Sequence, residues 1–313
     1  MARAATLGNG KILVGLDEVG FVRDFYFPYV GHSNHVSGAS GSYLHRIGVF
    51  VDGEMSWLSD PEWQISCKNP TNTGLGMVQA VHPRLQVSVT STDAVHNEQN
   101  VFLRSVVVGN KIETERDIKV FFAQQFRIDE SRRGDTGYYD PRNNTIVHYK
   151  GQVAFSACAM CDGEYFNEYN IGLFGIEGKE GTYKDAEDGI LEQNPIEHGS
   201  VDSVLALSKI VAGNEFMTAE YWLVCGHTLE ETRDLQRYVL DETPERLIRT
   251  TEKYWEAWLQ KEAVSCERLN APIVDLYQRS LFIMRTHTGD NGAIIASSDT
   301  DMLHHGRDTY SYV

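Results

Sequence analysis

Apolar and polar residues alternate along much of the first two thirds of the chain. In the segment 84–91, Leu85, Val87 and Val89 share one face of an extended backbone, while polar residues take the other face. Similar segments rich in Val, Ile, Phe and Tyr lie at 11–17, 21–28, 45–53, 77–92, 101–110, 118–128, 145–160 and 203–226. This period of two residues predicts a protein built mainly from β-strands.

Short turns connect several of these predicted strands. Asp52-Gly53 and Asn143-Asn144 contain residues that tolerate a positive φ, and both pairs therefore predict hairpins. No convincing helical period occurs before about residue 228. Many strands joined by short turns without helices between them predict a large antiparallel β-sandwich.

A period of 3.6 residues then replaces the alternation. Thr228 and Glu231 have the spacing of a capping box and predict a helix over 229–240. The Thr243-Pro244 pair predicts the start of a second helix, over 244–262. The predicted buried face of the second helix consists of Leu247, Ile248, Thr251, Tyr254, Trp255, Trp258 and Leu259.

A third helix is predicted over 271–287, with Pro272 in its first turn. Its apolar face consists of Ile273, Tyr277, Leu281 and Met284. The sequence offers this face nothing further to pack against. A single amphipathic helix is normally part of a larger helical unit, so we expect this helix to begin one.

The composition narrows the range of partners. Hydrophobic residues make up 42% of the 313 residues, which is enough for a sizeable core. The 28 Lys and Arg residues against 44 Asp and Glu residues give a net charge of −16. Nucleic acids and anionic membrane surfaces need basic patches, so we expect neither as the main partner. Five cysteines without framework spacing, no signal peptide and no apolar run of membrane-spanning length predict a cytoplasmic protein with reduced thiols.

Two groups of residues have the composition of metal sites. Cys158 and Cys161 have CxxC spacing, but a strand would place them on opposite faces, so we interpret them as small buried hydrophobic residues. Near the C-terminus the metal-capable residues are Asp299, Asp301, His304 and His305. Adjacent histidines cannot point the same way from an extended chain, and we expect no metal and no cofactor. Solvated loop residues or sugar hydrogen-bonding groups are the preferred interpretation.

The segment 23–36 combines aromatic rings with amide and imidazole groups. Its candidate residues are Tyr26, Phe27, Tyr29, His32, Asn34 and His35. Such a mixture suits a polyhydroxylated ligand, because rings stack on C–H faces while the polar groups bond to hydroxyls. A loop packed over the edge of the sandwich explains the same residues, and both interpretations stay open. No nucleophile with its base, phosphate-binding loop or H-E-x-x-H motif is present.

The last 25 residues carry a resemblance to a known family. Gly292-Ala-Ile-Ile-Ala-Ser297 and Arg307-Asp-Thr-Tyr-Ser-Tyr-Val313 resemble a segment of glycoside hydrolase family 15, the glucoamylase family. In that family the second motif continues into Trp-Pro-Arg-Asp. The start of the chain and the Trp255-x-x-Trp258 spacing also resemble the prokaryotic members.

The resemblance implies a division into three parts. Residues 1–227 would form a super-β-sandwich, 228–266 a helical linker, and 267–313 the start of an (α/α)₆ barrel that is otherwise missing. The chain is then expected to be an N-terminal fragment of a glucan 1,4-α-glucosidase-like enzyme. Its substrate would be an α-glucan or a gluco-oligosaccharide.

The resemblance also implies a mechanism and site residues. Two glutamates beyond residue 313 would act as general acid and general base in inverting hydrolysis, so no catalytic residue is assigned here and the chain is expected to be inactive alone. Tyr310 corresponds to a tyrosine that stacks on the sugar at the cleavage site. Arg307 and Asp308 are candidates for binding sugar hydroxyls or orienting the loop, and Tyr312 for packing beneath it. His304 and His305 depart from the motif, which leaves their role open.

Two alternatives remain at this point. The first is a non-catalytic β-sandwich protein whose aromatic segments bind carbohydrate without cleaving it, although such a protein has no use for an unpartnered helix over 270–287. The second is a relative of the same fold that cleaves trehalose or dextran. Neither linkage nor chain-length preference follows from these residues.

Overall fold

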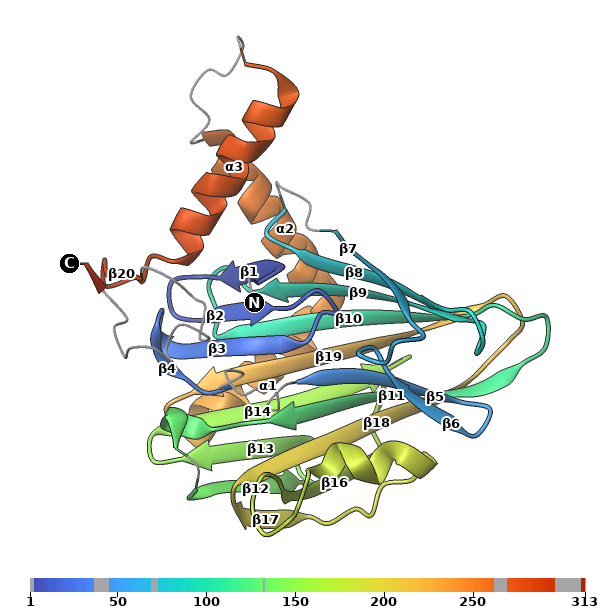
Figure 1. Cartoon of the computed structure of the whole chain (residues 1–313). Coiled ribbons are helices and arrows are strands. Elements are labelled where there is room, and N and C mark those ends of the chain that lie inside the picture. Colours follow the sequence, from blue (N-terminus) through green and yellow to red (C-terminus); the bar gives the residue numbers. More distant parts are fainter. Residues whose placement is uncertain are drawn as a thin grey trace.

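The computed structural model describes residues 3–36, 45–68, 73–131, 133–261, 269–295 and 311–312. Strands dominate this part of the chain, and the named strand pairs are antiparallel. They form one large sheet and two smaller ones, with helices on the outside of the large sheet (Figure 1). The predicted mainly β antiparallel sandwich is therefore confirmed.

The large sheet has ten strands among the described residues, with β15 (Glu164–Tyr165) paired only to β14. In spatial order the others are β17 (Ile196–Gly199), β12 (Asp135–Asp140), β13 (Thr145–Lys150), β14 (Val153–Cys161), β19 (Phe216–Gly226), β10 (Val101–Asn110), β9 (Val87–Val95), β8 (Gly76–His82) and β7 (Gln64–Lys68).

The opposing layer consists of two smaller sheets. One contains β1 (Ala5–Gly8), β2 (Leu13–Leu16), β3 (Val22–Tyr29) and β4 (His32–Asn34). The other contains β16 (Glu168–Leu173), β18 (Val201–Val211), β11 (Arg116–Gln125), β5 (Arg46–Val51) and β6 (Glu54–Trp57). The 3₁₀ helix η3 (Thr182–Asp188) covers the second sheet, and η2 (Ile128–Glu130) follows β11. A short ribbon pairs β20 (Ile294–Ile295) with β21 (Ser311–Tyr312).

The predicted strand faces and turns agree with this structure in most respects. Val87 and Val89 share a buried face of β9, as predicted. Leu85 is buried as well, but it lies in the turn that divides the predicted strand 77–92 into β8 and β9, where Gln86 has a φ of 50°. Asp52 and Asn144 adopt φ values of 55° and 49° in the turns between β5 and β6 and between β12 and β13. These two hairpins are confirmed, because a left-handed residue matches the twist of the strands on either side.

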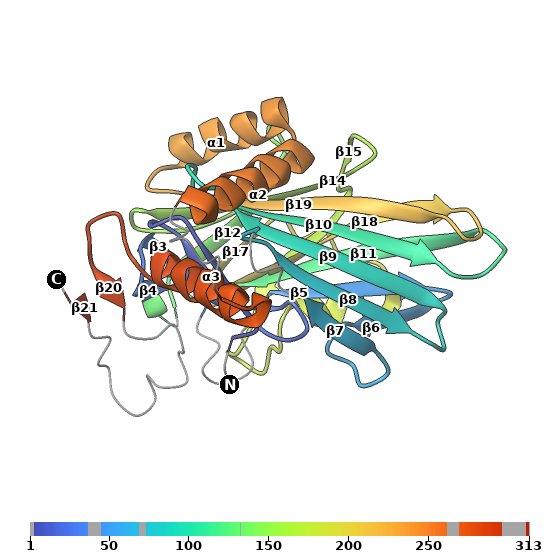
Figure 2. The same ribbon diagram turned by 90° about the horizontal axis from the view of Figure 1, so that it is seen from above.

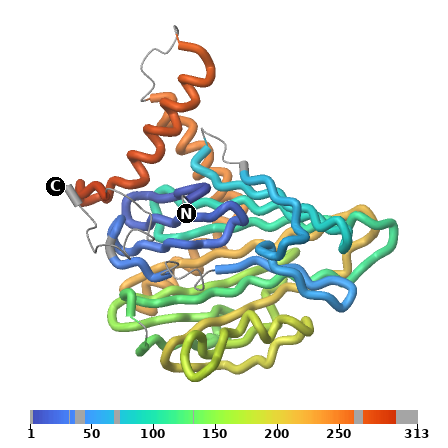
Figure 3. Tube along the Cα trace, in the orientation of Figure 1, coloured from blue at the N-terminus to red at the C-terminus, as the bar shows by residue number. Residues whose placement is uncertain are grey.

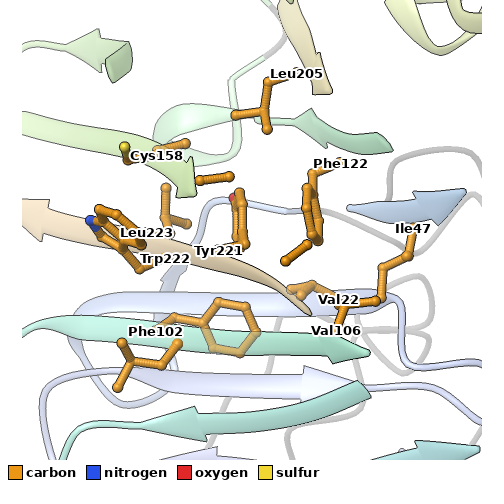
Figure 4. Packing of buried hydrophobic residues seen from close by; sticks show 14 of the residues in the cluster. Val22, Ile47, Phe102, Val106, Phe122, Cys158, Leu205, Tyr221, Trp222 and Leu223 are labelled. Carbon is orange, nitrogen blue, oxygen red and sulfur yellow. The ribbon is translucent and has the colours of Figure 1, made fainter. Parts of the chain in front are cut away.

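Phe155 lies where the three sheets meet. From β14 its ring stacks on Phe126, which follows β11, with centroids 4.7 Å apart. It also meets the edges of Phe25 and Phe27 from β3, at 5.6 and 6.3 Å. Farther along the same interface Phe122 and Tyr221 stack at 4.8 Å, and Figure 4 shows their rings side by side. Aromatic side chains bury large apolar areas, so these contacts join the two layers into one core.

A polar network is buried inside this core. The Ser203 hydroxyl donates to Gln124 Oε1 at 2.8 Å, and its oxygen therefore accepts from His148 Nε2 at 2.7 Å. This leaves His148 Nδ1 as a buried acceptor without a partner in the described structure. Burial lowers the pKa of His148 to about 3, because an imidazolium would lose its hydration there.

Helices α1 (Leu229–Glu242) and α2 (Pro244–Lys261) cover the outer face of the large sheet (Figure 2). Trp222 Nε1 on β19 donates to Gln236 Oε1 on α1 at 2.5 Å, and Gln236 Nε2 donates to Ser156 on β14. Thr228 caps α1 by accepting from Glu231 N at 3.1 Å. The predicted N-cap and the predicted positions of both helices are confirmed, although the Glu231 carboxylate accepts from His227 N and not from Thr228 N as in a complete capping box.

The predicted apolar face of α2 is mostly correct. Five members of it are buried: Leu247, Ile248, Thr251, Trp255 and Leu259. Tyr254, by contrast, is 38% exposed, because it lies at the margin of the face that contacts β9 and β10. The ring of Phe282 also packs nearly perpendicular to that of Trp255, with the two ring centroids 4.8 Å apart.

Phe282 belongs to α3 (Ala271–Thr286), which projects beyond the sandwich in Figure 1. Asn270 caps this helix and Pro272 lies in its first turn, as predicted. Ile273, Leu276 and Met284 are 47%, 64% and 56% exposed. The apolar face of α3 is thus only partly covered by the described residues.

Replacing Phe155 with alanine should destabilise the protein by about 3–5 kcal/mol, because it removes the ring shared by three sheets and leaves a cavity. Urea unfolding monitored by tryptophan fluorescence measures this change. Phe216→Ala is the matched control, since Phe216 is 59% exposed, and its effect should stay within about 0.5 kcal/mol. Equal effects of the two substitutions would contradict the central role of Phe155.

The buried neutral His148 predicts loss of stability in acid. Between its ordinary pKa of 6.5 and its native pKa of about 3, the unfolded chain binds a proton that the native state does not. This group therefore lowers the free energy of unfolding as pH falls, by up to about 1.4 kcal/mol per pH unit. His148→Gln should reduce that slope between pH 6 and 4 in urea titrations. The exposed His198→Gln serves as control, and identical slopes in both variants would refute the assignment.

Candidate functional site

The residues predicted to bind sugar lie outside the described residues. This holds for Arg307, Asp308 and Tyr310, and also for the metal-capable group Asp299, Asp301, His304 and His305. The structure does describe the backbone immediately after Tyr310. There β21 pairs with β20, with Ser311 opposite Ile295 and Tyr312 opposite Ile294.

After α3 the chain returns toward the N-terminal strands (Figure 3), and it contacts the sandwich at two glycines. Asp290 N donates to Gly10 O at 3.0 Å, in the turn between β1 and β2. Gly31, in the turn between β3 and β4, has φ +85°, and a Cβ there would lie 1.9 Å from Ile295 Cγ2. Ile295 is buried with Leu13 and Val30. The two turns of the N-terminal sheet therefore hold β20.

The segment 23–36 is a hairpin rather than the predicted loop. Tyr26, Phe27, Asn34 and His35 are buried, which supports the packing interpretation for these four residues. Asn34 Oδ1 accepts from the backbone of Phe25 and Val36, and Asn34 Nδ2 donates to Asp24. His35 Nδ1 accepts from Asp129 N. Their polar groups stabilise the fold and do not face a ligand.

Tyr29 differs from the rest of this hairpin because its side chain is 55% exposed.

Cys158 and Cys161 both lie in β14 and are buried, as predicted, and burial raises the pKa of both thiols. A raised pKa keeps a thiol protonated and unreactive. Within the described ranges, no three His, Cys, Asp or Glu residues converge as metal ligands.

A groove that we call the α1 groove lies where the β1–β2 turn, the loop at 96–100 and the start of α1 meet. It consists of two adjoining hollows of about 350 and 270 Å³, which share Lys11, Asn100 and Glu231. The first hollow adds Glu98, Asp234 and Tyr238, and the second adds Tyr29, His227 and Asp290. Sequence reasoning singled out only Tyr29 and Glu231 among these residues. The others are far apart in the chain and belong to no motif.

Asn9 fixes the base of the α1 groove. Its side-chain amide donates to the carbonyls of His96 and Gln99 at 2.9 and 3.0 Å. Its Oδ1 accepts from the backbone of Lys11 and Ile12 at 3.0 and 2.9 Å. One buried side chain thus ties the β1–β2 turn to the neighbouring loop.

The N-terminus of α1 forms the opposite wall. Glu231 Oε2 accepts from His227 N at 2.8 Å, and the His227 ring packs 5.3 Å from that of Phe27. At the far end, burial raises the pKa of the Tyr238 phenol, with the carboxylates of Glu242 and Glu98 acting in the same direction. The groove walls are therefore held by hydrogen bonds and packing within the chain.

Comparison with known proteins begins with the sequence. A scan against protein-family models finds no match. The chain is 25% identical over 188 residues to an uncharacterized glycosyl hydrolase of Methanocaldococcus jannaschii. That match covers 60% of this chain and 28% of the relative, so the chain spans less than a third of the length of the curated relative it matches.

Solved structures show the same fold. A bacterial glucoamylase complexed with acarbose matches 94% of this chain and 42% of its own, with a TM-score of 0.73 and 14% identity. A putative kojibiose phosphorylase from the human microbiome matches 91% of this chain and 39% of its own, with a TM-score of 0.56 and 10% identity. The sandwich with its helices is therefore a fold found in glucoamylase-like enzymes, and the sequence relative is a glycosyl hydrolase. Among the described helices, none has the length and apolar character to cross a membrane.

The contact between Gly31 and Ile295 predicts a local effect of substitution. Gly31→Ala should detach β20 from the hairpin, because the new methyl group would occupy the position of Ile295 Cγ2. Hydrogen exchange of residues 288–295 should accelerate. Gly53→Ala is a matched control, since Gly53 has φ +81° with no atom near its Cβ position. That control carries only the left-handed strain of about 1–2 kcal/mol and should leave β20 unchanged.

Proposed function

We propose that this chain is the N-terminal part of a glucoamylase-like glycoside hydrolase of family 15. The observation that carries the proposal is the coincidence of sequence motif and fold. Gly292–Ser297 and Arg307–Val313 resemble the family motifs, and they belong to a chain whose fold is shared with a glucoamylase over 94% of its length. The match to a glycosyl hydrolase supports the same class of activity.

The proposed enzyme has three parts. Residues 1–227 form the super-β-sandwich, 228–266 the helical linker and 267–313 the beginning of an (α/α)₆ barrel. The exposed apolar residues of α3 support this division, since Ile273 and Leu276 are about half exposed or more. Further barrel helices packed against α3 would bury that surface.

The proposed reaction is hydrolysis of an α-glucosidic bond with inversion. One glutamic acid beyond residue 313 protonates the leaving oxygen, and a second glutamate takes a proton from the attacking water. In inverting enzymes the two carboxyl groups lie roughly 6.5–9.5 Å apart, which leaves room for that water. No group of residues 1–313 is assigned to either step.

The described part of the chain would position the sugar-binding residues and would take no direct part in the hydrolysis. Tyr310 immediately precedes β21, which pairs with β20, and β20 in turn packs on Gly31. The N-terminal sheet would thereby fix the position of the Tyr310 ring relative to the sugar. Arg307 and Asp308 would bind sugar hydroxyls or orient this segment.

The proposed substrate is an α-glucan or a gluco-oligosaccharide, and trehalose or dextran are outcomes that a substrate panel would distinguish. The acarbose complex of the glucoamylase neighbour supports an oligosaccharide ligand. We further propose a cytoplasmic location, in keeping with the free thiols of Cys158, Cys161 and Cys225.

Residues 1–313 alone should release no glucose from maltose, starch or trehalose, because proximity of both carboxyl groups is what makes the displacement possible. A coupled glucose assay on the purified chain, with an active glucoamylase as positive control, tests this. Glucose release that follows this protein through purification would show that the catalytic pair lies within residues 1–313.

In the full-length enzyme, Tyr310→Ala should lower kcat and kcat/KM together, by about 2–4 kcal/mol of barrier, on the order of tens to a thousandfold. The reason is that the ring faces the sugar on which positive charge develops. Tyr310→Phe keeps the stacking surface and should be mild. Steady-state kinetics of both variants, with thermal unfolding alongside, decide the matter. An alanine variant with normal kcat would leave Tyr310 as a packing residue.

A further inference from the structure

The α1 groove offers a mixture of groups that the proposed reaction does not use. Its first hollow, of about 350 Å³, lies within the size range of small-molecule sites, and the second, of about 270 Å³, continues it. Tyr238 lines one hollow and Tyr29 the other. The groove is thus an elongated depression with an aromatic side chain in each half.

The charges of the groove restrict its ligand. Glu98, Glu231, Asp234 and Asp290 line it together with Lys11, but Asp234 pairs with Arg237 and Asp290 pairs with Arg285. The groove therefore carries little net charge, and a charged ligand would gain little electrostatic attraction there. The described carboxylates do not converge as metal ligands either. Dispersed carboxylates and amides suit a neutral ligand that carries many hydroxyl groups, because each acceptor takes one O–H donor.

Two further features point to such a ligand. Tyr29 is 55% exposed, although Tyr26 and Phe27 from the same strand are buried, so its ring is available for stacking. Asn100 lines both hollows and is partly exposed, although its Oδ1 is itself covered. Its side-chain amide can therefore donate to a hydroxyl oxygen of a ligand.

The groove is also rigid before any ligand arrives. Asn9 makes four hydrogen bonds across its base, and the Glu231 carboxylate fixes its wall by accepting from His227 N. Preorganised walls reduce the entropy lost on binding.

We propose that the α1 groove binds a neutral oligosaccharide at a non-catalytic site, separate from the sugar contact assigned to Tyr310. Tyr29 stacks on a sugar ring, the Asn100 side-chain amide donates to a hydroxyl oxygen, and the groove carboxylates accept from other hydroxyl groups. Only the expectation that the sugar is an α-glucan rests on the proposed function. The groove itself is defined by described residues.

The test is calorimetric titration of residues 1–313 with maltotetraose and, separately, with cellotetraose. Maltotetraose should bind, with an affinity that hardly changes with salt because the ligand is neutral. Tyr29→Ala should weaken binding about fivefold to tenfold. Asp234→Asn should weaken it as well, since a neutral amide is a poorer acceptor than a carboxylate. Tyr254→Ala, which removes a half-exposed tyrosine from α2 outside the groove, should leave the affinity unchanged.

Each outcome separates this proposal from the proposed function. Binding of cellotetraose alone, weakened by Tyr29→Ala, would support the groove and count against an α-glucan enzyme. Absence of binding to both sugars at millimolar concentration would overturn the groove proposal and leave the proposed function standing. Binding that survives both Tyr29→Ala and Asp234→Asn would also overturn it. Thermal unfolding of each variant checks that lost binding is not lost folding.

Discussion

The meeting of three sheets at Phe155 is the contact on which the rest of the structure depends. One ring from the large sheet packs on Phe126 from one small sheet and on Phe25 and Phe27 from the other. Two small sheets cannot each form a stable core alone, because burial of apolar area rises with the size of the unit. Packing both on one large sheet creates a single continuous core.

This core also fixes the end of the sandwich that holds β20. Because Phe25 and Phe27 anchor β3 from one side, the tip of the β3–β4 hairpin is held in place and presents Tyr29 and Gly31. Gly31 leaves room for Ile295, which fixes β20 and the strand paired with it. A substitution deep in the sandwich would therefore affect the position of the β20–β21 ribbon.

The outer helices extend the same arrangement. Trp222 and Gln236 join α1 to the large sheet through a buried hydrogen bond, and the capped start of α1 becomes a wall of the α1 groove. The other wall comes from the N-terminal sheet. The groove thus exists only because the helical layer and the small sheet meet at one end of the large sheet.

The sequence by itself determined the strand period, the turns at Asp52 and Asn144, and the three helices, because each follows from residues within about four positions of one another. Only the tertiary structure decided that Asn34 and His35 face the interior, where backbone groups satisfy them. It alone assembled the α1 groove, whose residues come from five distant parts of the chain. A local sequence pattern determines the secondary structure. The role of a polar side chain depends instead on hydrogen-bond partners that folding brings from distant parts of the sequence.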